Sequence, residues 1–254
     1  MPDFIAVIPA RAASTRLPGK MLADIAGKPL VIHTAERAKA SNASRIIIAT
    51  DDKNIAQCTQ DHGFETLLTR ETHPSGTDRL AEVATTLGFS DEQIVVNVQG
   101  DEPLIEPELI NETALALARN PDAAIATCAY PIKNSDSFFN PNSVKVICDT
   151  KGYAMYFSRA PIPWAREAFS HDRSHLPESF PALHHIGMYA YRAHFLKRFP
   201  LLAQGTLENI ESLEQLRALE HGYKIHVLQT NQAPLAGVDT PEDLERVRNF
   251  LANM

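Results

Sequence analysis

The fold is decided by a stretch near the start of the chain, Phe4–Lys20 (FIAVIPARAASTRLPGK). Its first five residues, Phe4–Ile8, are all apolar, and a run of this length is typical of a buried strand. A loop rich in small and basic residues follows, and a helix-like pattern then runs from Pro29 to about Ser41. A buried strand, a loop and a helix in this order indicate the first unit of an α/β fold.

The same order is repeated through the first half of the chain. Apolar runs at Ile46–Ala49 and Ile94–Val98 predict buried strands, and a weaker one lies near Phe64–Leu68. Helices are expected from Asp51 or Asp52 to about Gly63, over 78–87 and over 107–119. Continuous apolar strands that alternate with helices are typical of a parallel sheet covered on both faces. We therefore predict an α/β fold with a mostly parallel sheet.

The pattern changes near residue 130. Val144–Cys148 and Tyr153–Phe157 predict a hairpin, and His185–Tyr191 alternates like a strand. Between them, 161–181 is rich in Pro, Ser and His, which favours a long loop or lid. We interpret 130–205 as a smaller mixed β insert within a single domain that spans 1–254.

The last fifty residues return to regular elements. Leu207–Leu219 has apolar residues at helical spacing and predicts one amphipathic helix. Lys224–Gln229 predicts a strand, and Thr240–Phe250 predicts a closing helix with Thr240 as its N-cap.

Charge and composition exclude several classes of protein. The chain has 254 residues with 24 Lys+Arg and 31 Asp+Glu, a net charge of −7, which argues against general nucleic-acid binding. No apolar run approaches the ~20 residues that span a bilayer, and the N-terminus lacks the features of a signal peptide. Three scattered cysteines without a Cys-x-x-Cys pair form neither a disulfide framework nor a zinc site. We expect a cytoplasmic protein that is not attached to a membrane.

The loop after the first predicted strand has the character of a phosphate-binding site. It lies at a strand carboxyl end, where open α/β sheets bind their ligands. Small residues allow backbone N–H groups to approach phosphates, and Arg11, Arg16 and Lys20 supply cations. The loop is not a Walker A motif, which requires glycine where Ser14 stands, and no Gly-x-Gly occurs in the chain. A solvated basic turn is the alternative interpretation.

Two carboxylates are candidate ligands for Mg²⁺. Asp101 follows the strand Ile94–Val98 after a glycine, and Asp239 follows Gly237–Val238 at what we expect to be the end of another strand. Mg²⁺ prefers one or two carboxylates together with phosphate and water. The alternative for each residue is an ordinary aspartate at a helix start.

Nine motifs then follow one another along the chain in the order Ile8–Lys20, Ala49–Asp51, His73–Arg79, Val96–Pro103, Phe139–Lys145, Tyr156–Trp164, His185–Tyr189, Leu213–Arg217 and Gly237–Asp243. Over nearly its whole length the chain resembles the family of 3-deoxy-manno-octulosonate cytidylyltransferases, also called CMP-Kdo synthetases. Two departures are visible. Met21 replaces a usual proline, and the stretch around His171–Pro181 matches poorly.

The resemblance implies a Rossmann-like nucleotidyltransferase sheet and a reaction. CMP passes from CTP to the anomeric hydroxyl of 3-deoxy-D-manno-octulosonate (Kdo), giving CMP-Kdo and pyrophosphate for lipopolysaccharide biosynthesis, with Mg²⁺ as cofactor. Arg11, Lys20 and Asp101 would be catalytic, and Asp101 and Asp239 would hold the metal. The family is typically dimeric, which makes 130–205 the expected interface and sugar-binding region of a homodimer.

The resemblance also implies two binding sets. The nucleotide set is Ala10, Arg11, Ser14, Lys20, Ser75, Gly76, Thr77, Arg79 and Gln99. The sugar set is Arg159, His185, Tyr189, Glu211 and Gln215. Glu211 and Gln215 are expected on one helical face as an i, i+4 pair, with Glu214 beside them. A cytidylyltransferase for a sialic acid or another acidic sugar, and a catalytically silent nucleotide-binding protein, remain as alternatives.

Overall fold

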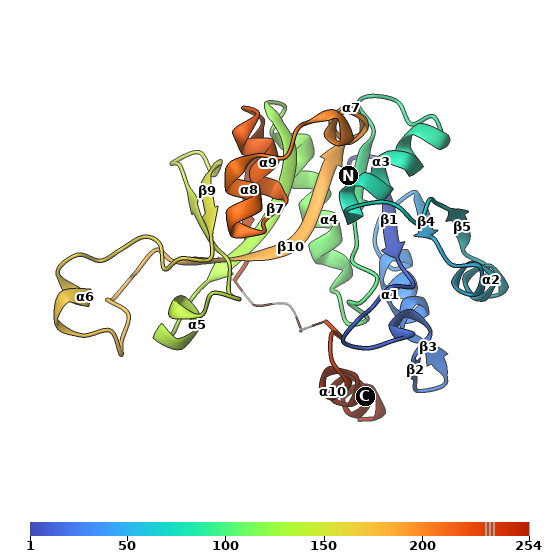
Figure 1. Ribbon diagram of the computed structural model, residues 1–254, viewed down its shortest axis with the longest axis horizontal. Coiled ribbons are helices and arrows are strands. Elements are labelled where there is room, and N and C mark those ends of the chain that lie inside the picture. The colour runs from blue at the N-terminus through green and yellow to red at the C-terminus, as the bar shows by residue number, and fades with distance from the viewer. Residues whose placement is uncertain (232, 234, 236, 254) are drawn as a thin grey trace.

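The computed structural model describes residues 1–231, 233, 235 and 237–253, and it contains one large mixed sheet with helices on both faces (Figure 1). The strands of its main path are β1 (Phe4–Ala10), β4 (Arg45–Thr50), β5 (Glu65–Leu68), β6 (Ile94–Asn97), β7 (Ala123–Pro131), β10 (Leu183–Arg192) and β11 (Lys224–Gln229). Their order across the sheet is β11-β7-β10-β6-β1-β4-β5. β10 is antiparallel to both of its neighbours on this path, while the other pairs are parallel. The predicted α/β fold with a mostly parallel sheet is confirmed.

Two smaller β elements complete the strands. The hairpin of β8 (Lys145–Cys148) and β9 (Ala154–Ser158) joins the main sheet through pairing of β8 with β10. A separate two-stranded sheet consists of β2 (Asp24–Ile25) and β3 (Lys28–Pro29). The hairpin lies where the sequence predicts it. β10 is a central strand of the main sheet, so the region 130–205 shares a strand with the body of the domain.

The helices cover both faces of the sheet, because successive side chains of each strand point to opposite faces and are buried there by different helices. Phe4, Ala6 and Ile8 of β1 pack in one cluster with α1 (Leu30–Lys39), α4 (Pro107–Arg119) and α10 (Pro241–Ala252). Ile5 and Val7 point the other way and pack with α3 (Gly76–Thr86), α7 (Ala193–Arg198) and α9 (Gln215–Glu220). Full burial of β1 on both faces explains why its sequence is continuously apolar.

The remaining helices are α2 (Lys53–Asp61), α5 (Ser135–Phe139), α6 (Ala168–His171) and α8 (Thr206–Glu211), with short 3₁₀ helices η1 (Lys20–Leu22) and η2 (Phe199–Leu201). Asp52 caps α2 by accepting from the N–H groups of Asn54 and Ile55. In the segment 161–181 a small aromatic core joins Phe169 and Phe180 to Phe138 of α5. No helix in the described part of the chain has both the length and the apolar character needed to cross a membrane.

The structure differs from the sequence predictions at three points. Leu207–Leu219 is not one helix: α8 and α9 are separated at Ser212, whose φ is 51°. The apolar stripe is divided accordingly, since Leu213 and Leu216 are buried while Ile210 is 75% exposed. β7 was missed altogether, because its alanine-rich sequence (AAIATCAYP) lacks the β-branched character of a typical strand. Asp239 also does not end a strand, since it comes ten residues after β11 ends at Gln229.

Candidate functional site

A cavity of about 570 Å³ opens at the carboxyl ends of β1 and β6. Of the predicted nucleotide set, the cavity lining contains Arg11, Ser14, Lys20, Ser75, Gly76, Thr77, Arg79 and Gln99. Ala10 is fully buried as the last residue of β1 and is not part of this lining. The sheet thus places the expected phosphate loop and the Ser75–Thr77 segment around one space, at the edge where α/β folds bind ligands.

Close packing of two loops forms the floor of the cavity. A Cβ atom on Gly100 would lie 2.7 Å from the carbonyl oxygen of Pro9, so only glycine allows the β6 loop to approach β1 this closely. Gly19, with φ of 70°, turns the first loop into η1 and so directs Lys20 back toward the cavity. The Lys20 side chain is 8% exposed.

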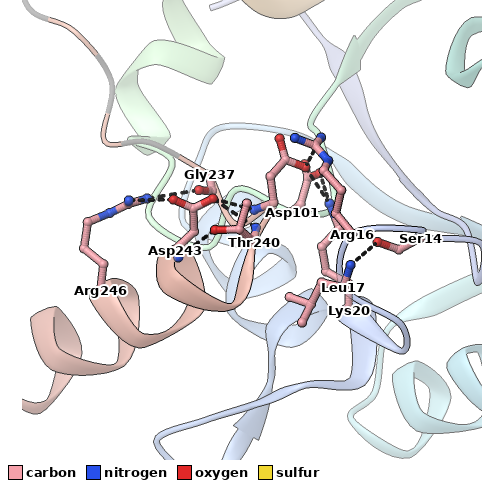
Figure 2. A network of polar contacts seen from close by, with 10 residues as sticks. Ser14, Arg16, Leu17, Lys20, Asp101, Gly237, Thr240, Asp243 and Arg246 are labelled. Atoms are coloured by element: carbon pink, nitrogen blue, oxygen red, sulfur yellow. Dashed lines mark hydrogen bonds and ion pairs between the residues drawn. The ribbon is translucent and has the colours of Figure 1, made fainter.

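Lys20 joins the two predicted metal ligands. Its Nζ donates to Oδ2 of Asp101 at 2.6 Å and to Oδ1 of Asp239 at 3.1 Å, while Arg16 Nη2 lies 3.0 Å from the same Asp239 oxygen (Figure 2). The backbone N–H of Val238 donates to the carbonyl of Asp101 at 2.8 Å, which fastens the segment before α10 to the β6 loop. Residues 138 positions apart in sequence therefore direct their carboxylates to one point.

Neither aspartate is needed as a helix cap. Thr240 is the N-cap of α10, as predicted: its side chain accepts from the N–H of Asp243, and the Asp243 carboxylate accepts from the N–H of Thr240 and of Asp239 (Figure 2). The N-cap position of α4 is Glu106, five residues after Asp101. Both carboxylates are therefore available to a ligand in the cavity.

The two carboxylates fit a cation that is shared with a phosphate. Within the described residues there is no group of three or more His, Cys, Asp or Glu side chains that could hold a metal by itself. Mg²⁺ commonly takes only one or two protein carboxylates and completes its shell with phosphate oxygens and water. Burial raises the pKa of the adjacent Glu102 to about 7, with the charges of Asp101 and Asp239 acting in the same direction. A cation bound here would favour the ionised form of all three neighbouring carboxyl groups.

The opposite wall is built around the start of α3. Ser75 is the N-cap of this helix, and its hydroxyl lies 2.5 Å from Oε1 of Glu214 and 2.6 Å from Oδ2 of Asp78. Glu214 lines the cavity, and burial raises its pKa. Sequence reasoning had placed Glu214 only beside the sugar set. It reaches the cavity because the break at Ser212 starts a new helix at this point.

Two further cavity residues, His73 and Asn97, belong to motifs of the family pattern that assign them no role. His73, on the loop before Ser75, contacts the Glu82 carboxylate of α3, and Asn97 is the last residue of β6. Arg79 directs its guanidinium to Asp51 and to the hydroxyl of Thr69. Asp51 belongs to a motif of the family pattern, and sequence reasoning predicts no role for it except as a helix cap.

The predicted sugar residues are spread over two places. Tyr189 lines the main cavity, and Gln215 lines a small adjoining one together with Tyr189 and Glu214. His185 hydrogen-bonds through Nε2 with the hydroxyl of Thr127 at 2.9 Å, and its ring centroid lies 5.4 Å from that of Tyr189.

Arg159 and Glu211 lie together at the junction of β9 and α8. The Glu211 carboxylate accepts from the backbone N–H of Arg159 at 2.9 Å, and Arg159 Nε donates to the carbonyl of Glu211 at 2.7 Å. The expected i, i+4 face of Glu211 and Gln215 does not form, because Ser212 ends the helix between them.

Comparisons with known proteins agree with this geometry. Residues 5–225 match the model of a family described as cytidylyltransferase. A solved structure titled as CMP:2-keto-3-deoxy-manno-octonic acid synthetase complexed with CTP is 39% identical, with 99% of each chain covered and a TM-score of 0.90. A cytidylyltransferase from Leptospira borgpetersenii serovar Hardjo-bovis (strain JB197) is 15% identical over all of this chain and 88% of its own, with a TM-score of 0.62, and so shares the fold. The resemblance read from the motifs is confirmed, and the chain belongs to the cytidylyltransferase family.

Proposed function

We propose that this chain is a Mg²⁺-dependent 3-deoxy-manno-octulosonate cytidylyltransferase, which converts CTP and Kdo into CMP-Kdo and pyrophosphate. The observation that carries the proposal is the convergence of Asp101, Asp239 and Lys20 at one side of a cavity whose other side is the Ser75–Thr77 segment. The structure that is 39% identical over 99% of the chain is titled as an enzyme for this sugar acid, complexed with CTP.

The reaction needs positioning and charge neutralisation more than covalent chemistry. The anomeric oxygen of Kdo forms a bond to the α-phosphorus of CTP, the bond from that phosphorus to the β-phosphate oxygen breaks, and the sugar hydroxyl loses its proton. Arg11 and Lys20 would hold the triphosphate and stabilise the negative charge on the departing pyrophosphate. Arg can do so with two parallel hydrogen bonds, whereas Lys acts as a point charge.

Asp101 and Asp239 would hold the metal. Bound there, Mg²⁺ would polarise the α-phosphate and lower the pKa of the sugar hydroxyl. Lys20 would then exchange its carboxylate partners for phosphate oxygens, so that the same ammonium group neutralises charge in either arrangement. Ser75, Gly76, Thr77, Arg79 and Gln99 would surround the cytidine. The sugar set would face it from β10, the end of β9 and the α8–α9 region.

The test is pyrophosphate release with Mg²⁺, in which CTP, UTP, GTP and ATP are crossed with Kdo and N-acetylneuraminate. Release with CTP and Kdo alone supports the proposal. Release with CTP and N-acetylneuraminate would support CTP as the nucleotide substrate but show that the acceptor is a sialic acid. No release in any combination from folded protein would favour a nucleotide-binding protein without activity.

The cellular setting is part of the proposal. We propose a cytoplasmic homodimer that supplies CMP-Kdo to lipopolysaccharide biosynthesis. Exposed apolar side chains on the hairpin and nearby helices are consistent with a partner surface, namely Met155 of β9 at 65%, Ile210 of α8 at 75% and Leu201 of η2 at 82% exposure. Light scattering of the purified protein tests the dimer, which predicts twice the mass of 28.1 kDa.

A further inference from the structure

One carboxylate outside the predicted site connects the two sides of the nucleotide cavity. Asp51 comes directly after β4, whose last residue, Thr50, pairs with Ala10 of β1 on one side and with Leu68 of β5 on the other. The loop after β1 carries the cations of the cavity, and the segment after β5 leads into α3. The register of the sheet therefore places Asp51 between the phosphate side and the Ser75–Thr77 side.

The Asp51 carboxylate bonds to both sides at once. Oδ1 accepts from the backbone N–H of Ala12 at 2.9 Å, in the cationic loop. Oδ2 accepts from Arg79 Nη2 at 2.7 Å, in the first turns of α3. Arg79 also donates to the hydroxyl of Thr69, which in turn donates to the carbonyl of Thr50 at 3.1 Å. Each carboxylate oxygen thus holds a different wall of the cavity, and the second wall is anchored again to β4.

Burial and charge make this connection stiff. The side chains of Arg79 and Asp51 are 4% and 10% exposed. Burial alone would raise the pKa of Asp51, but the N–H of Ala12 and the guanidinium of Arg79 outweigh it and leave that pKa below its usual value. The pair is therefore ionised at neutral pH, and buried charged hydrogen bonds of this kind are strong and directional.

We propose that Asp51 is a positioning residue for nucleotide binding, which holds the loop 11–19 and the start of α3 at the separation that CTP requires. The inference rests on the proposed function, since it assumes that the loop binds the triphosphate while Ser75–Thr77 binds the cytidine. One nucleotide must meet both sets of groups at once, so any relative shift of the two walls loses affinity.

The test compares Asp51→Ala and Asp51→Asn. Alanine removes both contacts, whereas the asparagine side-chain oxygen can still accept from Ala12 but carries no charge for Arg79. We expect Asp51→Ala to weaken CTP binding by about tenfold or more in a calorimetric titration, with Asp51→Asn between it and the wild type. KM for CTP should rise in parallel while kcat at saturating CTP stays within about twofold. Amide exchange over 11–19 should become faster.

Asp52→Ala is the matched control. This neighbouring carboxylate caps α2 through the N–H groups of Asn54 and Ile55, both at 2.8 Å, and among the described residues it bonds to neither wall. Its loss should lower stability and leave CTP affinity unchanged. Unchanged CTP affinity in both Asp51 variants, or an equal loss in Asp52→Ala, overturns the proposal. Wild-type protein that binds CTP without converting Kdo would contradict the proposed sugar, while the binding and exchange comparisons would still decide the role of Asp51.

Discussion

At the scale of single residues, the site depends on carboxylates whose charges are balanced by cations of the same cavity. Asp101 and Asp239 share the ammonium group of Lys20, and Arg16 adds a second cation beside Asp239. A ligand that brings both a metal ion and phosphates can replace every one of these partners with a group of the right charge. The arrangement suits a nucleotide that enters together with its cation.

The variant Asp101→Ala tests whether the Asp101 carboxylate takes part in catalysis. We expect kcat/KM for CMP-Kdo formation to fall by a factor on the order of a hundred or more, because a group that stabilises charge in the transition state is lost. Glu106→Gln is the control, since this exposed carboxylate precedes α4 and pairs only with Arg37 among the contacts of the described residues. Activity within about twofold of wild type in Asp101→Ala would remove Asp101 from the mechanism.

The half-buried His185 of β10 predicts how stability depends on pH. Burial lowers the pKa of His185 to about 3, with the neighbouring His184 acting in the same direction. Because the unfolded-state value is about 6.5, the unfolded chain binds more protons below that pH, and the native state loses stability as pH falls. From pH 7.5 to pH 5.5 this residue should account for a loss of about 1.4 kcal/mol in the free energy of unfolding.

Urea unfolding at the two pH values measures this loss. His185→Gln has no ionisable group there, so its stability should fall less than that of the wild type over the same interval. His62→Gln, at an exposed position, should keep the wild-type difference. A His185→Gln variant with the full wild-type loss would show that the imidazole is not buried in its neutral form.

At the scale of elements, the break between α8 and α9 brings Glu214 and Gln215 to the cavity side. Ser212 adopts φ of 51° and ψ of 50°, the left-handed conformation that side chains with a Cβ atom disfavour. The apolar spacing of 207–219 could not show this break, because serine carries no glycine-like signal for a positive φ. β7 could not be predicted either, because alanine has a low strand propensity. The sheet nevertheless buries the β7 alanines on both faces.

Replacement of Ser212 tests the conformation of the break. Ser212→Gly should raise the free energy of unfolding by roughly 0.5–1 kcal/mol, and Ser212→Val should lower it by more than about 1 kcal/mol. Ser137→Gly is the matched comparison, because Ser137 lies within α5 and glycine there should cost about 0.5–1 kcal/mol. Chemical denaturation gives all three values. A loss of stability in Ser212→Gly similar to that in Ser137→Gly would contradict the left-handed conformation.

At the scale of the whole molecule, the sequence motifs predicted which segments line the cavity better than they predicted the contacts between those segments. The strand-then-loop pattern located a loop that lines the cavity, and the two separated aspartates expected at one site both bond to Lys20. The contacts that join the walls could not be read from the sequence, because they depend on strand order: Asp51 meets Ala12 and Arg79 only once β4 lies between β1 and β5. Positions of Arg159 and Glu211 likewise depend on how the hairpin meets α8.

Binding of nucleotide and metal should stabilise the whole domain together. At about one hundred times its Kd, a ligand adds roughly 2.7 kcal/mol, which raises the melting temperature of a domain of this size by about 5–10 °C. We expect CTP with Mg²⁺ to give a clearly larger shift than CTP with a chelator, and GTP with Mg²⁺ to give little. Equal shifts with and without the metal would contradict a cation held jointly by Asp101, Asp239 and phosphate.

The proposed reaction joins a cytidylyl group to the sugar acid in this cavity and releases pyrophosphate. Phosphorus NMR of the protein with CTP, Kdo and Mg²⁺ follows both products in one sample. We predict that the triphosphate signals disappear while one phosphodiester signal and pyrophosphate grow in equal amounts. Formation of orthophosphate instead, or a CTP spectrum that does not change while the protein stays folded, would contradict the account.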